Sequence, residues 1–474
     1  MKRKDPMNQS SAKYSRILKV LGRMAPPLPT DMLDKEFSGK EMTDDLDFML
    51  KTMEEVHPDL FFNLSHQDMN TLVSEAKQKL LSGGVSREKF FMLASGIVAR
   101  IGDDHTAITL PTEKYAENAQ AEGSVFPFEV SCTDGRVTVK RSFATDLDGA
   151  VINSINGVDC NDILSGLLST MSGMTMDNRE SMAAVSFRKY LFLMYGSASE
   201  FRLVVKKEEK TETLTVPGVT STLVGKIMTA ESSSPASSPY EYEIHKNKGY
   251  ALLSLRQSVD HSVFSSLIKK MFTEIKEAGV KNLIIDLRGN SGGQSSLADD
   301  LCSYLTEKPF NHFVRVDVKV SRQIRKYYSA VCKHLASFPM SLLPARFIHG
   351  EPWKKSVGEI VSSFDEPGYP NETDLHFTGR VLALTDSFTA SAASDLAVVL
   401  KDNGIGKTVG KDTGGFASSY GDSYLFSLPN TFLQCRVSHK FFVRPSGDET
   451  PGPVVPDYPV EADALKFAVD LLTV

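Results

Sequence analysis

Apolar side chains recur at different intervals in successive regions of the chain. Between residues 30 and 101 they follow helical spacing, which predicts helices opening at Thr43 as an N-cap and covering residues 68–81 and 87–101. The spacing then changes to short strand-like runs around one helix, and Asn156-Gly157 marks a hairpin. These strands are expected at residues 126–130, 136–140, 150–155, 201–205 and 212–216, with the helix at 161–171. The pattern predicts a small helical domain followed by a compact β-rich module.

From residue 249 onwards, apolar strands alternate with amphipathic helices. Strands are expected at residues 250–255, 282–287 and 381–385. Helices are expected at 262–278 and 390–402, and a further helix after the glycine turn that follows residue 287 is expected to end at about residue 305. Such alternation is typical of crossover units in an α/β core. The expected organisation is a lead-in at 1–30, a helical domain at 31–115, a β-rich module at 116–220, a Ser/Pro-containing linker at 221–245 and an α/β core at 246–474.

Composition narrows the class of protein. The chain has 474 residues, of which 41% are hydrophobic and 24% charged, as in ordinary globular proteins. The net charge of −6 disfavours nucleic acid as a partner, because phosphate binding needs a clustered basic surface. No run of about 18 apolar residues predicts a membrane span. The basic start of the chain lacks a following apolar stretch, so no export signal is expected in the sequence as given, and the compartment stays open.

Motifs for metals and cofactors are missing from the sequence. The five cysteines are widely spaced and form no CxxC pair, which argues against a zinc knuckle, a redox pair or a disulfide scaffold. There is no HExxH helix and no EF-hand loop. We therefore expect chemistry without a metal or an organic cofactor.

Two strand-to-helix turns hold the residues best suited to chemistry. Residues 286–294 read Asp-Leu-Arg-Gly-Asn-Ser-Gly-Gly-Gln, and residues 385–394 read Thr-Asp-Ser-Phe-Thr-Ala-Ser-Ala-Ala-Ser. Sites in α/β sheets form at the carboxyl ends of strands, where helix N-termini offer free N–H groups. The first turn contains a G-x-S-x-G pattern around Ser291. That pattern is typical of a nucleophile elbow, but it also fits a tight structural turn or an oxyanion hole.

Four stretches taken together resemble the tail-specific (C-terminal-processing) serine peptidase family. They are residues 282–293, residues 389–395 with Lys401-Asp402, residues 409–415 and residues 452–460. The β-rich module around residues 152–157 is similar to the family's PDZ-like domain. The resemblance implies an α+β multidomain protein, with an N-terminal helical domain, a PDZ-like β-module and a C-terminal α/β serine peptidase core of the ClpP/crotonase-like kind.

The same resemblance assigns roles within the two turns. It implies that Ser391 is the nucleophile, with Ser387 and Ser394 as local competitors, and that the N–H groups of Gly293 and Ala392 form the oxyanion hole. An oxyanion-hole donor typically contributes about 3 kcal/mol of transition-state stabilisation.

A serine nucleophile also needs a base. The lysine branch of the family places it in the segment where this chain carries Phe416. The tricorn-like branch uses a histidine and a carboxylate instead. The Asp-Asp-His-Thr segment at residues 103–106 makes His105 that base, and Glu449 fits the late carboxylate, with adjacent Asp448 as the alternative.

These residues predict a serine endopeptidase that cleaves peptides or proteins through an acyl-enzyme. One alternative is a non-catalytic protein that binds peptides or hydrophobic ligands on the same scaffold. Another is an esterase-like hydrolase that uses Ser291, with Asp422 and His439 as its nearest acid and base. The substrate, the specificity, C-terminus binding by the PDZ-like module and the oligomeric state stay open.

Overall fold

The computed structural model describes residues 24–173, 175–232, 238–335 and 354–473, and these form parts of two compact units. The α/β unit comprises residues 238–421 and 439–474, and the helical–β unit comprises residues 21–237 and 422–438. Strands β17 (Ser419–Ser427) and β18 (Gln434–Val443) each begin in one unit and end in the other. Within the described residues, no helix has both the length and the apolar character needed to cross a bilayer.

The α/β unit is built on a six-stranded sheet in the order β10-β11-β12-β15-β16-β19. All neighbouring pairs are parallel except β10 with β11. The strands are β10 (Tyr240–His245), β11 (Tyr250–Leu255), β12 (Asn282–Asp286), β15 (Arg380–Thr385), β16 (Lys407–Gly410) and β19 (Tyr458–Pro459). The strands predicted at 250–255, 282–287 and 381–385 are thereby confirmed to within one residue at either end.

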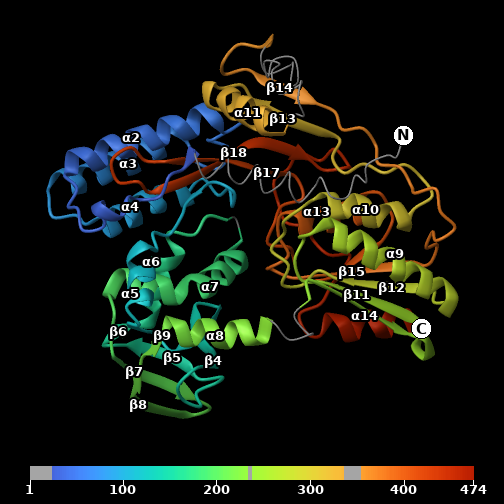
Figure 1. Cartoon of the computed structure of the whole chain (residues 1–474), viewed down its shortest axis with the longest axis horizontal. Helices are drawn as coiled ribbons and strands as arrows, with labels where there is room; N and C mark the ends of the chain where they lie inside the picture. Colours follow the sequence, from blue (N-terminus) through green and yellow to red (C-terminus); the bar gives the residue numbers. More distant parts are fainter. Residues whose placement is uncertain (1–23, 174, 233–237, 336–353, 474) are drawn as a thin grey trace. The chain divides into compact units, whose positions relative to one another are not determined.

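Helices cover both faces of this sheet (Figure 1). On one face lie α9 (His261–Ala278), α10 (Ser296–Leu305) and α13 (Ala392–Asp402), and on the other lies α14 (Ala464–Thr473). Side chains alternate accordingly in β12, where Leu283 and Ile285 pack in the core under the first three helices and Ile284 packs in the core beside α14. Burial on both faces explains why these strands read as continuous apolar runs.

A second sheet has the order β1-β18-β13-β14, with β17 also paired to β18. Its other strands are β1 (Ala107–Ile108), β13 (Arg315–Lys319) and β14 (Ile360–Ser363). The first part of β18 pairs with β1, and its last residues pair with β13. Helix α11 (Arg322–Leu335) follows β13 in the chain.

Three helices open the helical–β unit: α2 (Gly39–Val56), α3 (His66–Leu81) and α4 (Arg87–Ala99). The prediction of Thr43 as the first N-cap is wrong. Ser38 caps α2 in a capping box with Glu41, whose pKa falls to about 2 mainly through the hydrogen bond from the Ser38 backbone. Thr43 instead lies buried one turn inside the helix.

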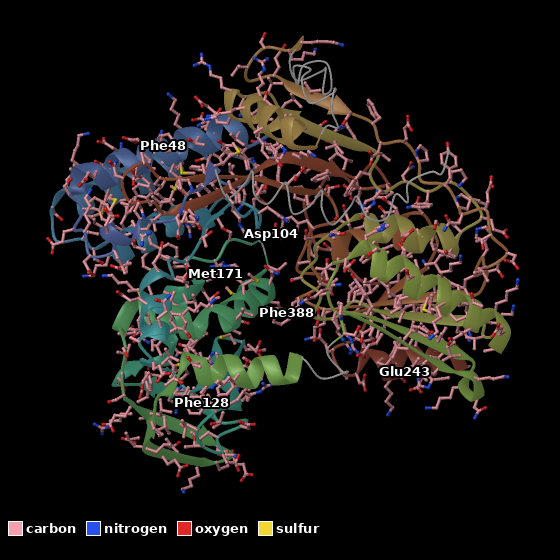
Figure 2. All side chains as sticks on the ribbon, viewed as in Figure 1. Phe48, Asp104, Phe128, Met171, Glu243 and Phe388 are labelled. Carbon is pink, nitrogen blue, oxygen red and sulfur yellow. The ribbon has the colours of Figure 1, made fainter. Side chains whose placement is uncertain are left out.

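The β-rich module contains a sheet in the order β3-β4-β5-β7-β8, with β6 paired to β5. Its strands are β3 (Phe128–Thr133), β4 (Arg136–Ser142), β5 (Val151–Ile155), β6 (Val158–Asp159), β7 (Glu200–Lys207) and β8 (Lys210–Pro217). Asn156 and Gly157 turn the β5–β6 hairpin with φ values of 50° and 83°, as predicted. Figure 2 labels Phe128, which is buried in the core of this module.

Helices complete the module and extend beyond it. The expected helix is α6 (Cys160–Leu168), but a second one, α7 (Met176–Tyr195), was not predicted. The segment expected as a linker contains helix α8 (Ser221–Ser232), whose Val224 packs with Val125 and Val219. It also contains strand β10, which pairs with β11. Residues 233–237 of that segment lie outside the described residues. Short elements β2 (Ser124–Val125), β9 (Val219–Thr220) and α5 (Glu113–Gln120) lie at the module's boundaries.

Candidate active site

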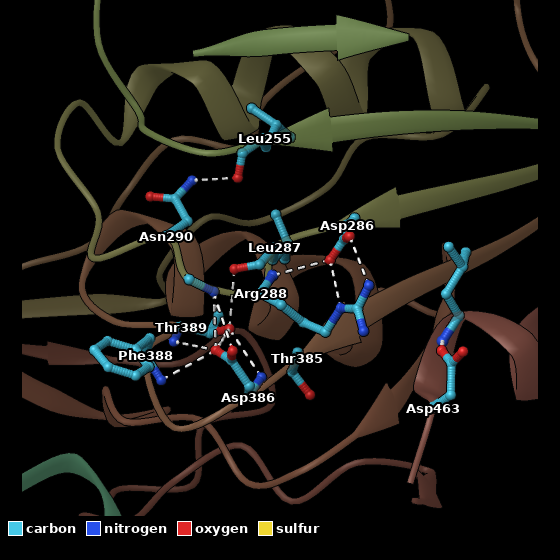
Figure 3. Close-up of polar contacts among 12 residues, drawn as sticks. Leu255, Asp286, Leu287, Arg288, Asn290, Thr385, Asp386, Phe388, Thr389 and Asp463 are labelled. Carbon is cyan, nitrogen blue, oxygen red and sulfur yellow. Dashed lines mark hydrogen bonds and ion pairs between the residues drawn. The ribbon is translucent and has the colours of Figure 1, made fainter. Parts of the chain in front are cut away.

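Loops at the carboxyl ends of adjacent strands β11, β12 and β15 are tied together in the α/β unit (Figure 3). The Leu287 N–H donates to the Leu384 carbonyl at 3.0 Å, and the Ala390 N–H donates to the Asn290 carbonyl at 3.0 Å. The buried Asn290 side chain donates to the Leu255 carbonyl at 3.1 Å. The two predicted turns therefore meet at the edge of the sheet where α/β proteins place their sites.

Ser391 has an uncommon backbone conformation. It is the N-cap residue of α13 with φ 50° and ψ −129°, and its side chain makes no capping hydrogen bond. A positive φ in a residue with a Cβ costs on the order of 1–3 kcal/mol and persists where the surrounding structure imposes it, often at functional sites. The half-buried Ser391 hydroxyl is thus presented at the tip of a strained strand-to-helix turn.

Two glycines make room for this turn. A Cβ added to Gly292 would lie 2.7 Å from the Ser391 Cβ, and one added to Gly415 would lie 2.7 Å from the Ser391 nitrogen. Gly415 also donates its N–H to the Thr389 carbonyl at 3.1 Å. The glycine-rich loops after β12 and β16 are therefore in van der Waals contact with the predicted nucleophile.

The N–H groups of Gly293 and Ala392 are the expected oxyanion-hole donors. The neighbouring N–H groups are occupied, since Gly292 donates to Asn290 Oδ1 at 2.9 Å and Gln294 donates to the Ser258 carbonyl at 2.6 Å. In the described part of the chain, the N–H groups of Gly293 and Ala392 have no hydrogen-bond partner. Gly293 has φ 138°, and a Cβ there would lie 2.1 Å from the Ser258 carbonyl oxygen, so this backbone approach requires glycine.

The competing serines differ from Ser391. Ser291 is exposed, lacks a positive φ and lies five residues before α10 begins at Ser296, so it does not form an elbow at the start of a helix. Ser394 is buried and donates its hydroxyl to the Ser391 carbonyl at 2.7 Å. For the Ser291 alternative, His439 lies in the α/β unit, 3.2 Å from the Tyr328 hydroxyl, whereas Asp422 belongs to the other unit.

His105 lies in the helical–β unit, in the loop before β1. Its Nδ1 lies 2.8 Å from Asp104 Oδ1. Burial acts to lower the pKa of His105, but the charge and hydrogen bond of Asp104 and the charge of Asp103 outweigh it and raise the pKa to about 9. A hydrogen bond from Nδ1 to a carboxylate leaves Nε2 as the nitrogen that can accept a proton.

Asp103 holds the His105 loop from within the unit. Its buried carboxylate accepts hydrogen bonds from the His105 N–H at 2.9 Å and the Ser438 hydroxyl at 2.6 Å, and it lies 3.2 Å from His57 Nε2. Asp59 donates its N–H to His57 Nδ1 at 3.1 Å, which leaves the hydrogen on Nε2 for Asp103. Burial alone would raise the pKa of Asp103, but the hydrogen bond and electrostatic interaction with His57, the electrostatic interaction with His105 and the hydrogen bond from Ser438 hold it well below its usual range.

Glu449 lies on an exposed loop of the α/β unit. Its Oε1 pairs with Arg315 Nη1 at 2.8 Å, and this hydrogen bond lowers the pKa of Glu449. The adjacent Asp448 carboxylate accepts the Thr450 N–H at 2.9 Å. Phe416, at the position where a lysine base would be expected, is buried in the core. Within the α/β unit, the structure brings together Ser391, Ala392 and the Gly292–Gly293 pair, whereas His105 belongs to the other unit.

Residues 254–460 match peptidase family S41. This match lies within the segment that the sequence analysis assigns to the α/β core. This match confirms the tail-specific peptidase family identified from the sequence, and with it the class of a serine-type peptidase hydrolase.

Solved structures of CPAF share the fold. A crystal structure of a CPAF mutant has a TM-score of 0.65 at 15% identity and covers 92% of this chain and 96% of that one. Mature CPAF complexed with lactacystin has a TM-score of 0.61 at 16% identity and covers 92% of this chain and 98% of that one. Comparison with curated proteins gives no significant match.

Two carboxylates near the predicted groups were missed by sequence reasoning. The sequence gives Asp104 no separate role, although its position next to His105 is a signal for the side-chain contact that the structure shows. Asp386 lies within the second turn, where the sequence analysis assigns it no role. The Asp-x-x-Thr spacing from Asp386 to Thr389 indicates a local side-chain-to-backbone turn.

Proposed function

We propose that the chain is a serine endopeptidase that cleaves peptides or proteins through an acyl-enzyme, with Ser391 as its nucleophile. The observation that carries this proposal is the φ of 50° at Ser391, at the start of α13 and in close contact with Gly292 and Gly415. The match of residues 254–460 to peptidase family S41 supports the same reaction class.

In the proposed reaction, Ser391 Oγ attacks the scissile carbonyl carbon while His105 Nε2 removes its proton. The N–H groups of Gly293 and Ala392 stabilise the oxyanion that develops. His105 then protonates the leaving amine, and a water molecule hydrolyses the acyl-enzyme by the reverse sequence of proton transfers.

A carboxylate is needed to fix the tautomer of His105. Glu449 remains the proposed third member of the triad, with Asp448 as its neighbour. Asp104 is a further candidate, because it already lies 2.8 Å from His105 Nδ1 in the helical–β unit. The β-rich module around residues 152–157 is proposed to be PDZ-like and to bind an extended peptide by strand addition.

Active-site labelling tests the nucleophile. A fluorophosphonate probe followed by peptide mapping should place the label on Ser391 in the wild type. The label should be lost in Ser391→Ala and His105→Ala and retained in Ser291→Ala, which is the matched control on the neighbouring loop.

Other patterns of labelling would contradict the proposal. Label on Ser291 would favour the esterase-like hydrolase. A folded wild type that takes no label and cleaves no casein would favour the non-catalytic binding protein.

A further inference from the structure

The two proposed oxyanion-hole donors lie on separate loops. The Gly293 N–H belongs to the loop after β12, and the Ala392 N–H belongs to the turn after β15. Both must point at one oxygen atom in the transition state, so the position of one loop relative to the other sets the strength of the hole. A displacement of about 1 Å between reacting groups can cost on the order of 100-fold in rate.

Asp386 binds both loops with one carboxylate (Figure 3). From the first loop, the Gly289 N–H donates to Oδ1 and Oδ2, both at 3.1 Å. From its own loop, the N–H groups of Phe388 and Thr389 each donate to Oδ1 at 3.0 Å. No other described carboxylate accepts backbone N–H groups from both of these loops.

Thr389 completes this connection. Its hydroxyl accepts the Asp386 N–H at 3.0 Å and lies 3.1 Å from both the Leu287 carbonyl and Asp386 Oδ1. Thr389 itself is buried and precedes the Ala390-Ser391-Ala392 turn. A shift of Asp386 would therefore be passed directly to the nucleophile and to one of the donors.

The charge of Asp386 is balanced by N–H groups. Among the described residues, no basic side chain forms an ion pair with it; nearby Arg288 pairs instead with Asp286, at 2.8 Å from Nε to Oδ1. A carboxylate with only acceptor atoms suits three convergent N–H donors, whereas an asparagine amide would direct N–H groups at some of them.

We propose that Asp386 is a positioning residue for the oxyanion hole. By accepting N–H groups from both loops, it holds Gly293 and Ala392 at the separation that one oxyanion requires. This inference rests on the proposed role of Ser391 as the nucleophile.

The test measures inactivation of the full-length protein by a fluorophosphonate, separating the maximal rate from the half-saturating concentration. In Asp386→Asn the maximal rate should fall about 10- to 100-fold, because the oxyanion donors lose their alignment. The half-saturating concentration should change less than about twofold. A variant that only loses stability would keep the maximal rate in its folded fraction.

Asp457 supplies a matched control with the same Asp–Thr chemistry. Its carboxylate accepts the Thr408 N–H at 2.9 Å, and its own N–H donates to the Thr408 hydroxyl at 3.0 Å, at the start of β16. Asp457→Asn should lower the thermal midpoint without lowering the maximal inactivation rate. If Asp386→Asn fails to fold, Thr389→Val should show the rate loss and Thr389→Ser should restore it.

Each outcome decides the proposal. Labelling of Ser391 at wild-type rates in Asp386→Asn or Thr389→Val would overturn the positioning role while leaving the nucleophile intact. A wild type that is not labelled at Ser391 would remove the proposed function, and this inference with it. An equal rate loss in Asp457→Asn would show a general structural effect and would also overturn it.

Discussion

At the scale of single residues, the carboxylates of Asp104 and Asp103 contact His105 in different ways. Asp104 contacts the imidazole through Nδ1, while the buried Asp103 accepts the His105 backbone N–H. Together they favour the imidazolium and raise the pKa of His105 to about 9 against the effect of burial. A general base must be neutral to accept a proton, so this environment favours activity on the alkaline side.

The pH dependence of labelling tests this effect. Because His105 is protonated below its raised pKa, the rate of fluorophosphonate labelling should increase with pH up to about 9. Asp104→Asn removes the charge that stabilises the imidazolium and should move the midpoint to lower pH by about one unit. Asp47→Asn, which removes an exposed ion pair with Lys77 in the same unit, is the control. An unchanged midpoint in Asp104→Asn would contradict the assignment.

At the scale of elements, the start of α13 depends on how closely two loops approach it. Gly292 and Gly415 contact Ser391 where no side chain fits, and Asp386 joins the β12 and β15 loops. The strain at Ser391 is retained because several hydrogen bonds hold the turn at the same time. The site is therefore a property of three loops on adjacent strands.

Adding a methyl group at Gly415 tests this packing. Gly415 has no positive φ, so Gly415→Ala adds steric overlap alone, with a Cβ 2.3 Å from Ser394 Oγ and 2.7 Å from the Ser391 nitrogen. Overpacking of this kind costs about 1–3 kcal/mol, and labelling of Ser391 should fall with it. Gly452→Ala is the control, since its Cβ would meet open space. Equal labelling and thermal midpoints in both variants would contradict the packing argument.

At the scale of the whole molecule, the proposed catalytic groups come from both units. Ser391 and its oxyanion donors belong to the α/β unit, and His105 belongs to the helical–β unit. In the latter, Ser438 of β18 donates to Asp103, so a segment from the C-terminal half of the chain supports the His105 loop. The buried Asp103 cluster thus connects distant parts of the sequence within one unit.

Removal of Asp103 should destabilise that unit. The pKa of Asp103 is lowered in the folded protein from its usual value near 3.8. The stabilisation from this carboxylate is therefore fully present above pH 3.8 and is lost as the pH falls towards the lowered pKa. At neutral pH, Asp103→Ala should cost about 3 kcal/mol, because it leaves buried donors without an acceptor. Hydrogen exchange should accelerate in α2, α4 and β1 and stay unchanged in β12 and β15. Asp47→Ala is the variant for comparison. If hydrogen exchange in α2 and α4 is as slow in Asp103→Ala as in the wild type, the prediction is contradicted.

Much of the fold could be predicted because its signals are local. Periodicity located α3, α4, β11, β12, β15 and α13, since burial on defined faces leaves a pattern in the sequence. Helix α7 was not predicted, because its buried face includes polar Asn178, Glu180 and Ser181 and so leaves no clear apolar stripe in the sequence. The N-cap of α2 was assigned to Thr43 rather than Ser38, because both residue types suit a cap and the capping box starts before the periodic residues.

The sequence by itself determined the peptidase family, the alternating α/β core and the two turns that hold Ser391 and Gly293, because each of these is written in consecutive residues. Only the tertiary structure decided that Ser391 has a positive φ, that Gly292 and Gly415 lie against it, and that Asp386 binds two loops. These features depend on contacts between segments up to about a hundred residues apart in the chain. Such contacts arise only when neighbouring strands pair, so no local pattern encodes them.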